Sequence, residues 1–101
     1  MRTFVMFDLP VLTAADRREY RRFRKFLVKT GFVMLQESVY SKITLNSTAA
    51  KAVVENIRKS APEKGSVMLM IVTEKQYENI EYITGDFQSE FVTTPEKLVV
   101  L

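Results

Sequence analysis

The order of hydrophobic patterns along the chain is the feature that most restricts its possible folds. Four short runs are rich in β-branched and aromatic side chains, which predicts strands over residues 3–9, 32–36, 38–45 and 67–72. Residues 13–30 and 48–60 instead repeat apolar side chains at helical spacing. The predicted order is therefore strand–helix–strand, followed by a second strand–helix–strand unit.

Local signals mark the ends of these elements. Asp16 follows Thr13 by three residues, a spacing that lets a hydroxyl and a carboxylate cap a helix start reciprocally. Gly31 is expected to end the first helix, because glycine readily takes the left-handed conformation found after a helix end. The junction at Glu37 and Ser38 contains no glycine or proline, so a tight turn is expected between the second and third strands.

Two such units predict an α+β protein with a ferredoxin-like β-α-β-β-α-β fold, in which an antiparallel sheet carries both helices on one face. The other sheet face is also apolar, because residues 4–9, 32–35 and 67–72 carry large apolar side chains at both the odd and the even positions, which point to opposite faces of the sheet. The run over 67–72 is expected to be buried on both faces. An exposed apolar face of this size marks an interface, which predicts a homodimer packed sheet to sheet.

The length of 101 residues fits a single domain over 1–101, with a core over 1–73 and a C-terminal extension over 74–101. Three short elements are expected near or in this extension: a helical turn over 73–80, an edge strand over 80–84 and a strand over 97–101. A hydrophobic terminal strand needs a partner, so it is expected to add to a sheet edge, such as that of a second copy.

The composition excludes several classes of chemistry. The chain has no Cys and no His, which removes thiolate nucleophiles, zinc–cysteine sites and the imidazole base. Carboxylates, hydroxyls, Lys or Arg would have to act, and a metal would be a hard cation held by oxygen. No apolar run approaches the roughly 20 residues of a membrane span, and no signal-peptide pattern opens the chain. A cytoplasmic protein is therefore expected.

The first predicted helix is strongly basic. Its positive residues are Arg17, Arg18, Arg21, Arg22, Arg24, Lys25 and Lys29. Only Asp16 and Glu19 offset them, so the helix is not expected to be laced with its own ion pairs. A charged face in contact with solvent is the simpler interpretation. The excess of positive over negative residues, and the forked Arg donors that suit phosphate, instead favour binding to a nucleic-acid backbone without sequence preference.

Asp8 ends the first strand on the same alternation as Phe4 and Met6. Alone, such a residue most often caps the turn before a proline, here Pro10. If its row faces a twin chain, two copies approach each other. With water and a phosphate oxygen, two carboxylates can hold Mg²⁺ in octahedral geometry, and the ion can activate water for phosphodiester cleavage.

Two hydroxyl residues offer a third signal. Ser38 and Tyr40 share one alternation of the predicted third strand, which neighbours the first strand in this fold. Their hydroxyls could hold a metal-bound water or a phosphate. Ordinary strand composition is the alternative interpretation.

Three segments carry a family resemblance over almost the whole chain. "MFDLP" (6–10), "YRRFRKFLVKTGFVMLQESVYSK" (20–42) and "VMLMIVTEKQY" (67–77) resemble, in the same order, the small CRISPR-associated adaptation endonuclease. This family supplies the second of the two core CRISPR adaptation proteins, and the resemblance is to its type II subtype. "EKLVVL" at the end also fits the family's last strand.

The resemblance implies a ferredoxin-like homodimer that cleaves single-stranded RNA or double-stranded DNA with Mg²⁺. It assigns the metal to Asp8 and relates activity to four further positions, Arg17, Arg18, Ser38 and Tyr40. It also implies an architectural role, in which the dimer bridges subunits of the CRISPR integrase and lays a DNA duplex on Arg21, Arg22, Arg24 and Lys25. Three functions thus stay open: an endonuclease, a scaffold without relevant cleavage, and a small-ligand regulatory domain on the same fold.

Overall fold

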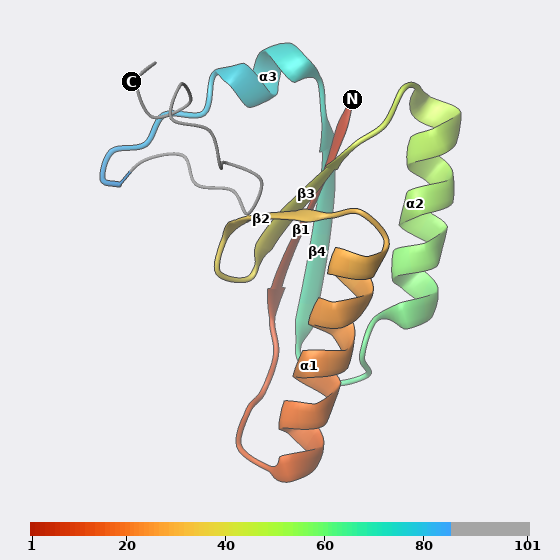
Figure 1. Ribbon diagram of the computed structural model, residues 1–101, viewed down its shortest axis with the longest axis vertical. Helices are drawn as coiled ribbons and strands as arrows, with labels where there is room; N and C mark the ends of the chain where they lie inside the picture. Colours follow the sequence, from red (N-terminus) through yellow and green to blue (C-terminus); the bar gives the residue numbers. More distant parts are fainter. Residues whose placement is uncertain (86–101) are drawn as a thin grey trace.

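The computed structural model describes residues 1–85 and places four strands in one antiparallel sheet (Figure 1). The strands are β1 (Arg2–Asp8), β2 (Val33–Gln36), β3 (Val39–Ile43) and β4 (Ser66–Val72), in the spatial order β2-β3-β1-β4. Two long helices, α1 (Ala14–Lys29) and α2 (Ser47–Ser60), follow β1 and β3, and a short helix, α3 (Glu74–Glu78), follows β4. The predicted ferredoxin-like fold is confirmed, and β1 is central because it pairs with both β3 and β4.

The predicted helix ends are close to the observed ones. Thr13 Oγ1 accepts a hydrogen bond from the Asp16 amide at 3.0 Å, while the Thr13 amide donates to Asp16 Oδ2 at 3.2 Å, which confirms the capping box. Gly31 takes a left-handed φ of 100°. Helix α2 starts one residue earlier than predicted, because Asn46 Oδ1 caps it by accepting from the Ala49 amide at 2.8 Å.

The core lies between the sheet and the two long helices. Phe7 is at its centre, with ring centroids 5.3 Å from Phe23 of α1 and 5.8 Å from Tyr40 of β3. Leu27 of α1 and Ile57 of α2 belong to the same buried cluster. Because Phe7 points into this layer, the alternation of β1 sends its even-numbered side chains to the opposite, open face of the sheet.

The open face is apolar and only partly covered. Phe4 packs edge-on against Tyr77 of α3, with ring centroids 5.9 Å apart. Met68 and Met70 on the edge strand β4 remain 59% and 49% exposed. The prediction that residues 67–72 are buried on both faces is therefore wrong for the single chain, because β4 has a neighbour on one side only and nothing described covers these methionines.

Residues 80–84 form no strand, so the predicted edge strand there is wrong. They run beside the open face and line a groove of about 460 Å³ together with Phe4, Met6, Leu35 and Met70. The segment thus borders a groove on the open face and does not pair with a sheet edge. The predicted strand over 97–101 lies outside the described residues. Within residues 1–85, no helix has the length and apolar character needed to cross a membrane.

Candidate metal and nucleic-acid site

Asp8 is the last residue of the central strand, and its side chain is exposed. Pro10, which has no amide hydrogen to donate to a neighbouring strand, follows two residues later. Across residues 1–85, no hydrogen bond or ion pair engages the Asp8 carboxylate. Nor does this part of the chain bring three or more acidic side chains together as a metal-binding group. At the end of β1, one chain therefore offers a single carboxylate, whereas Mg²⁺ is usually bound by one or two carboxylates together with phosphate oxygens and water.

The backbone around Asp8 is held from both neighbouring strands. On one side, Asp8 is in register with Ser66, the first residue of β4. On the other, the Phe7 amide donates to the Ser38 carbonyl at 3.1 Å. The carboxylate therefore extends from a backbone fixed between the β2–β3 turn and the loop before β4.

Ser38 lies in the β2–β3 turn, not on the third strand as predicted. Gln36 pairs with Val39, which leaves Glu37 and Ser38 as a two-residue turn. Ser38 takes a positive φ of 66°, the sign that a type II turn requires at its third residue. The prediction that the side chains of Ser38 and Tyr40 point to the same face of the third strand is therefore wrong. The Ser38 carbonyl nevertheless accepts a hydrogen bond from Phe7, the residue before Asp8.

Tyr40 belongs to the core. Its side chain is 1% exposed, and its ring stacks on Phe7 on the helix-covered face of the sheet. The alternation of β1 places the Asp8 side chain on the opposite face. The single chain therefore does not bring the three predicted catalytic side chains into one cluster: Asp8 is accessible, Ser38 is close through its backbone, and Tyr40 supports the strand from behind.

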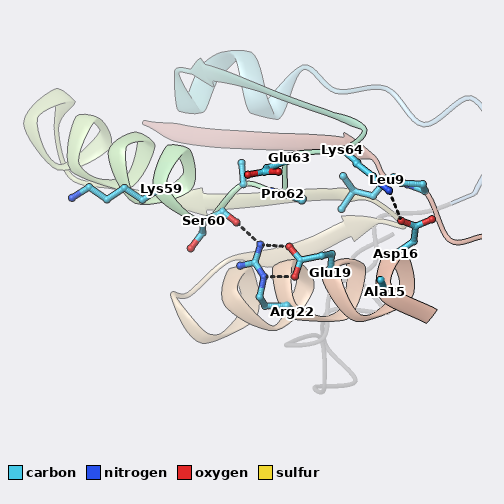
Figure 2. Close-up of a pocket in the computed structure, with 12 residues that line it drawn as sticks. Leu9, Ala15, Asp16, Glu19, Arg22, Lys59, Ser60, Pro62, Glu63 and Lys64 are labelled. Carbon is cyan, nitrogen blue, oxygen red and sulfur yellow. Dashed lines mark hydrogen bonds and ion pairs between the residues drawn. The ribbon is translucent and has the colours of Figure 1, made fainter. Parts of the chain in front are cut away.

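The basic helix α1 divides into two groups of residues. The guanidinium groups of two exposed residues, Arg17 and Arg22, are hydrogen-bonded to other parts of the chain. Arg17 donates to the carbonyls of Val11 and Leu12, at 3.2 Å each. Arg22 binds both carboxylate oxygens of Glu19 and donates to the Ser60 carbonyl at 2.8 Å, as Figure 2 shows.

The second group faces solvent. Arg21, Arg24 and Lys25 are exposed and make no hydrogen bond or ion pair with residues 1–85. Arg18 is also exposed, and it is near enough to Glu19 to add to the lowering of the pKa of that carboxyl, which comes first from the Arg22 hydrogen bond. Of the six Arg and Lys residues at positions 17–25, which were predicted to bind nucleic acid, four are thus available to an outside phosphate, whereas Arg17 and Arg22 already have partners.

A groove of about 500 Å³ lies between the start of α1 and the loop after α2 (Figure 2). Its charges largely neutralise one another. Arg22 pairs with Glu19 at 3.0 Å, and Lys64 Nζ lies 3.7 Å from Asp16 Oδ1. The pKa of Asp16 is lowered, first by the Thr13 amide and further by Lys64. Lys59 and Glu63 also line the groove and have no ion pair among residues 1–85, but their charges are opposite, so the lining carries no net charge that would favour a small charged ligand.

Sequence patterns missed two features that hold the ends of β1. One is the contact of Gly65 with the backbone of Asp8, for which the only signal was a glycine directly before a predicted strand. The other is the group formed by Arg2, Glu74 and Tyr77 at the opposite end, which joins residues more than 70 positions apart and leaves no local pattern.

A sheet in the order β2-β3-β1-β4 with two helices on one face defines the ferredoxin-like class. Within this class, residues 1–80 match the family model of CRISPR associated protein Cas2. The chain is 50% identical to the CRISPR-associated endoribonuclease Cas2 of Treponema denticola, over the full length of both. It is 43% identical to that of Streptococcus mutans serotype c, over all of this chain and 93% of the relative. The chain belongs to the Cas2 family.

A solved structure supports the fold. The crystal structure of Streptococcus pyogenes Cas2 at pH 6.5 matches with a TM-score of 0.62 and 19% identity, covering 83% of this chain and all of the other. The family resemblance seen in the sequence is confirmed, and the predicted class of enzyme, an endonuclease, agrees with the names of the relatives.

Proposed function

We propose that the protein is a Mg²⁺-dependent endonuclease of CRISPR adaptation that hydrolyses phosphodiester bonds in the cytoplasm. One observation carries this proposal: the central strand ends in an exposed carboxylate, Asp8, that has no partner among residues 1–85. The curated relatives are named endoribonucleases, so single-stranded RNA is the first substrate to test and duplex DNA the second.

The proposed active unit is a homodimer. Asp8 is on the same sheet face as Met6, Met68 and Met70, and the described chain leaves Met68 and Met70 on this face 59% and 49% exposed. Packing two such faces together would bury the methionines and bring the two Asp8 residues to one interface. Each chain then contributes one carboxylate to the metal site.

The donor set of this dimer suits Mg²⁺, because carboxylate and phosphate oxygens are the ligands that hard cations prefer. A bound Mg²⁺ would supply the positive charge that activates water and stabilises the transition state. The chain's own residues have separate tasks. Asp8 holds the metal, and the exposed positive residues of α1, Arg18, Arg21, Arg24 and Lys25, bind the phosphates on either side of the scissile bond.

A second candidate function is architectural. The exposed side chains of Arg21, Arg24 and Lys25 lie on one helix and suit a phosphate backbone better than a base edge. In this role the dimer would hold a DNA duplex and join the CRISPR integrase, and its own cleavage would not matter. Both functions need the basic helix, but only the nuclease needs Asp8.

The substitution Asp8→Asn separates the two functions. The nuclease proposal expects Mg²⁺-dependent cleavage of RNA or DNA to fall on the order of 100-fold or more, because metal ligation contributes several kcal/mol of charge stabilisation. Duplex binding should stay unchanged in a filter or fluorescence assay. Wild-type protein with chelator is the control. Cleavage undiminished in the variant would contradict the assignment to Asp8, and spacer acquisition that survives the loss of cleavage would favour the scaffold.

The basic helix is tested by salt. If the dimer neutralises about six phosphates, log affinity should fall against log salt with a slope of about −5. Replacing both Arg21 and Arg24 by Ala should reduce that slope by about 0.9 for each phosphate that is no longer neutralised, equally for unrelated sequences. Arg58→Ala, on α2 and already paired with Glu55, is the matched control. A slope near zero in the wild type would reject backbone binding by α1.

A further inference from the structure

Gly65 makes an unusually close approach to the strand end that carries Asp8. Its φ is +86°, and a Cβ added there would lie 2.6 Å from the carbonyl oxygen of Asp8. The same Cβ would lie 3.0 Å from Leu9 Cδ2 and 3.1 Å from Leu9 Cα. Two of these three atoms are backbone, so no side-chain rotation can relieve the contact. Only the absence of a side chain lets the two segments come this close.

Any side chain at Gly65 would therefore move the peptide that follows Asp8. Ordinary van der Waals contact begins at 3.4 Å, so the carbonyl oxygen would have to shift by about 0.8 Å. The rest of β1 cannot follow this shift freely. Phe7 is fixed in the core, and its amide is bonded to the Ser38 carbonyl at 3.1 Å. Leu9 belongs to the same buried cluster, so the displacement would fall on the peptide between Asp8 and Leu9 and on the exposed Asp8.

Gly65 itself is held from the other side. Its neighbour Lys64 reaches Asp16 in the first turn of α1 at 3.7 Å (Figure 2), and Ser66 pairs with Asp8 in the sheet register. The exposed ion pair of Lys64 holds the loop only weakly, but an outward movement of the loop would also break the pairing of Ser66 with Asp8 at the start of β4. The strain of an added side chain thus falls on the end of β1.

We propose that Gly65 is a positioning residue for Asp8: its missing side chain lets the loop before β4 close on the Asp8–Leu9 peptide and thereby fixes the direction of the Asp8 carboxylate. This inference rests on the proposed function, in which Asp8 holds the metal. Functional groups must be held within about 0.5 Å of their working position, and a misplacement of about 1 Å can cost on the order of 100-fold in rate.

The chain contains a matched control. Gly85 has nearly the same φ, +84°, but an added Cβ there would meet nothing within 4 Å. Gly65→Ala and Gly85→Ala therefore impose a similar backbone strain and differ in the contact with Asp8. Gly31 is a second control, because at φ +100° its added Cβ would meet only the flexible end of Lys42.

The test compares these three Ala variants with Asp8→Asn and the wild type. We expect Gly65→Ala to lower kcat for Mg²⁺-dependent cleavage roughly 10- to 100-fold per folded molecule, with KM for the nucleic acid essentially unchanged and more Mg²⁺ needed for half-maximal rate. Gly85→Ala and Gly31→Ala should keep the wild-type kcat. Equal kcat in Gly65→Ala and Gly85→Ala would overturn the inference. If Asp8→Asn still cleaves, the proposed function fails instead.

A second variant covers the case in which Gly65→Ala does not fold. Asn tolerates the left-handed conformation better than Ala but still carries a Cβ. Gly65→Asn should therefore fold and show the same loss of kcat, and the ¹³Cγ resonance of its Asp8 should respond to Mg²⁺ only at raised concentration. An unchanged Mg²⁺ titration would contradict the inference. If neither variant folds, Gly65 acts on folding and not on the direction of Asp8, and the inference is likewise overturned.

Discussion

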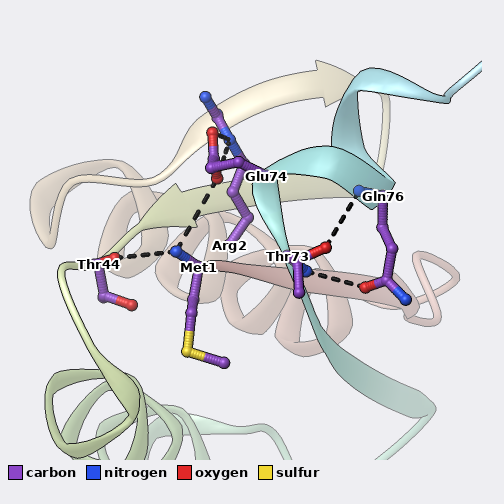
Figure 3. A network of polar contacts seen from close by, with 6 residues as sticks. All are labelled: Met1, Arg2, Thr44, Thr73, Glu74 and Gln76. Carbon is purple, nitrogen blue, oxygen red and sulfur yellow. Dashed lines mark hydrogen bonds and ion pairs between the residues drawn. The ribbon is translucent and has the colours of Figure 1, made fainter.

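The two ends of β1 carry opposite charges on the same open face of the sheet, and the structure treats them differently. At the first end, Arg2 Nε lies 3.0 Å from both carboxylate oxygens of Glu74 (Figure 3). The Arg2 guanidinium also stacks over the Tyr77 ring, with Cζ 3.8 Å from the ring centroid. At the other end, Asp8 has no such partner among residues 1–85. One charge holds the fold together, and the other is left available.

The surroundings of Arg2 strengthen this contrast. The N-terminal amine of Met1 donates to the Thr44 carbonyl at 3.1 Å and lies 4.0 Å from Glu74 (Figure 3). Helix α3 begins at a capping box made by Thr73 and Gln76. Several elements therefore meet at this end of β1, and the contact of Arg2 with Glu74 joins β1 to α3.

Asp16 shows what a structural carboxylate looks like in this protein. It is 9% exposed, accepts from the Thr13 amide and lies next to Lys64. Asp8 has none of these properties. A carboxylate that is kept on a well-ordered strand but given no partner is better suited to bind something from outside the chain than to stabilise it.

The largest expected effect is a separation of activity from stability at Asp8. Asp8→Ala should abolish metal-dependent cleavage, yet change the free energy of unfolding in urea by no more than about 0.5 kcal/mol, because the side chain is exposed and unpaired. Destabilisation well beyond that value would mean that Asp8 is a turn-capping residue, as the simpler interpretation of the sequence holds.

The opposite result is expected at the other end of the strand. Arg2→Ala should destabilise the protein by about 1–2 kcal/mol, because it removes a partly buried, charged hydrogen bond and a cation–π contact. Cleavage per folded molecule should not change. Arg58→Ala is the control, since its ion pair with Glu55 is exposed on both sides and is worth about 0.5 kcal/mol or less. Equal losses of unfolding free energy in Arg2→Ala and Arg58→Ala would contradict a stabilising role for Arg2.

The smallest effect concerns the pH dependence at Asp16. Its pKa in the folded protein is lowered from 3.8, so its contribution is fully present above that pH and is lost as the pH falls through the folded pKa. Asp16→Asn should therefore lower the free energy of unfolding at neutral pH, with a difference from the wild type that shrinks below pH 3.8. In a Thr13→Ala background the difference should be only partly reduced, because the substitution removes the Thr13 hydroxyl but keeps the amide that is the first cause of the lowered pKa. A pH-independent difference would contradict this account.

The sequence predicted the strands, both long helices, the capping box at Thr13 and the left-handed Gly31 close to where they occur. Those features depend on neighbours a few residues away. It misplaced Ser38 on a strand and residues 80–84 in a sheet edge, because both outcomes depend on which backbone groups lie opposite them in the fold. It also did not distinguish Arg22 from Arg21 and Arg24, whereas Arg22 donates a hydrogen bond to a carbonyl 38 residues away.

The sequence by itself determined the order of elements and the family of this protein, because periodicity, caps and collinear motifs are properties of the chain read in order. Only the tertiary structure decided which charges are used and which are free. Arg2 binds Glu74, which is 72 residues away in the sequence. Gly65 lies close to the backbone of Asp8, although most of the described chain separates these two residues in sequence. Such pairings form when the folded sheet closes, since hydrogen bonds, ion pairs and close backbone contacts act over a few ångströms in space, whatever the separation along the chain.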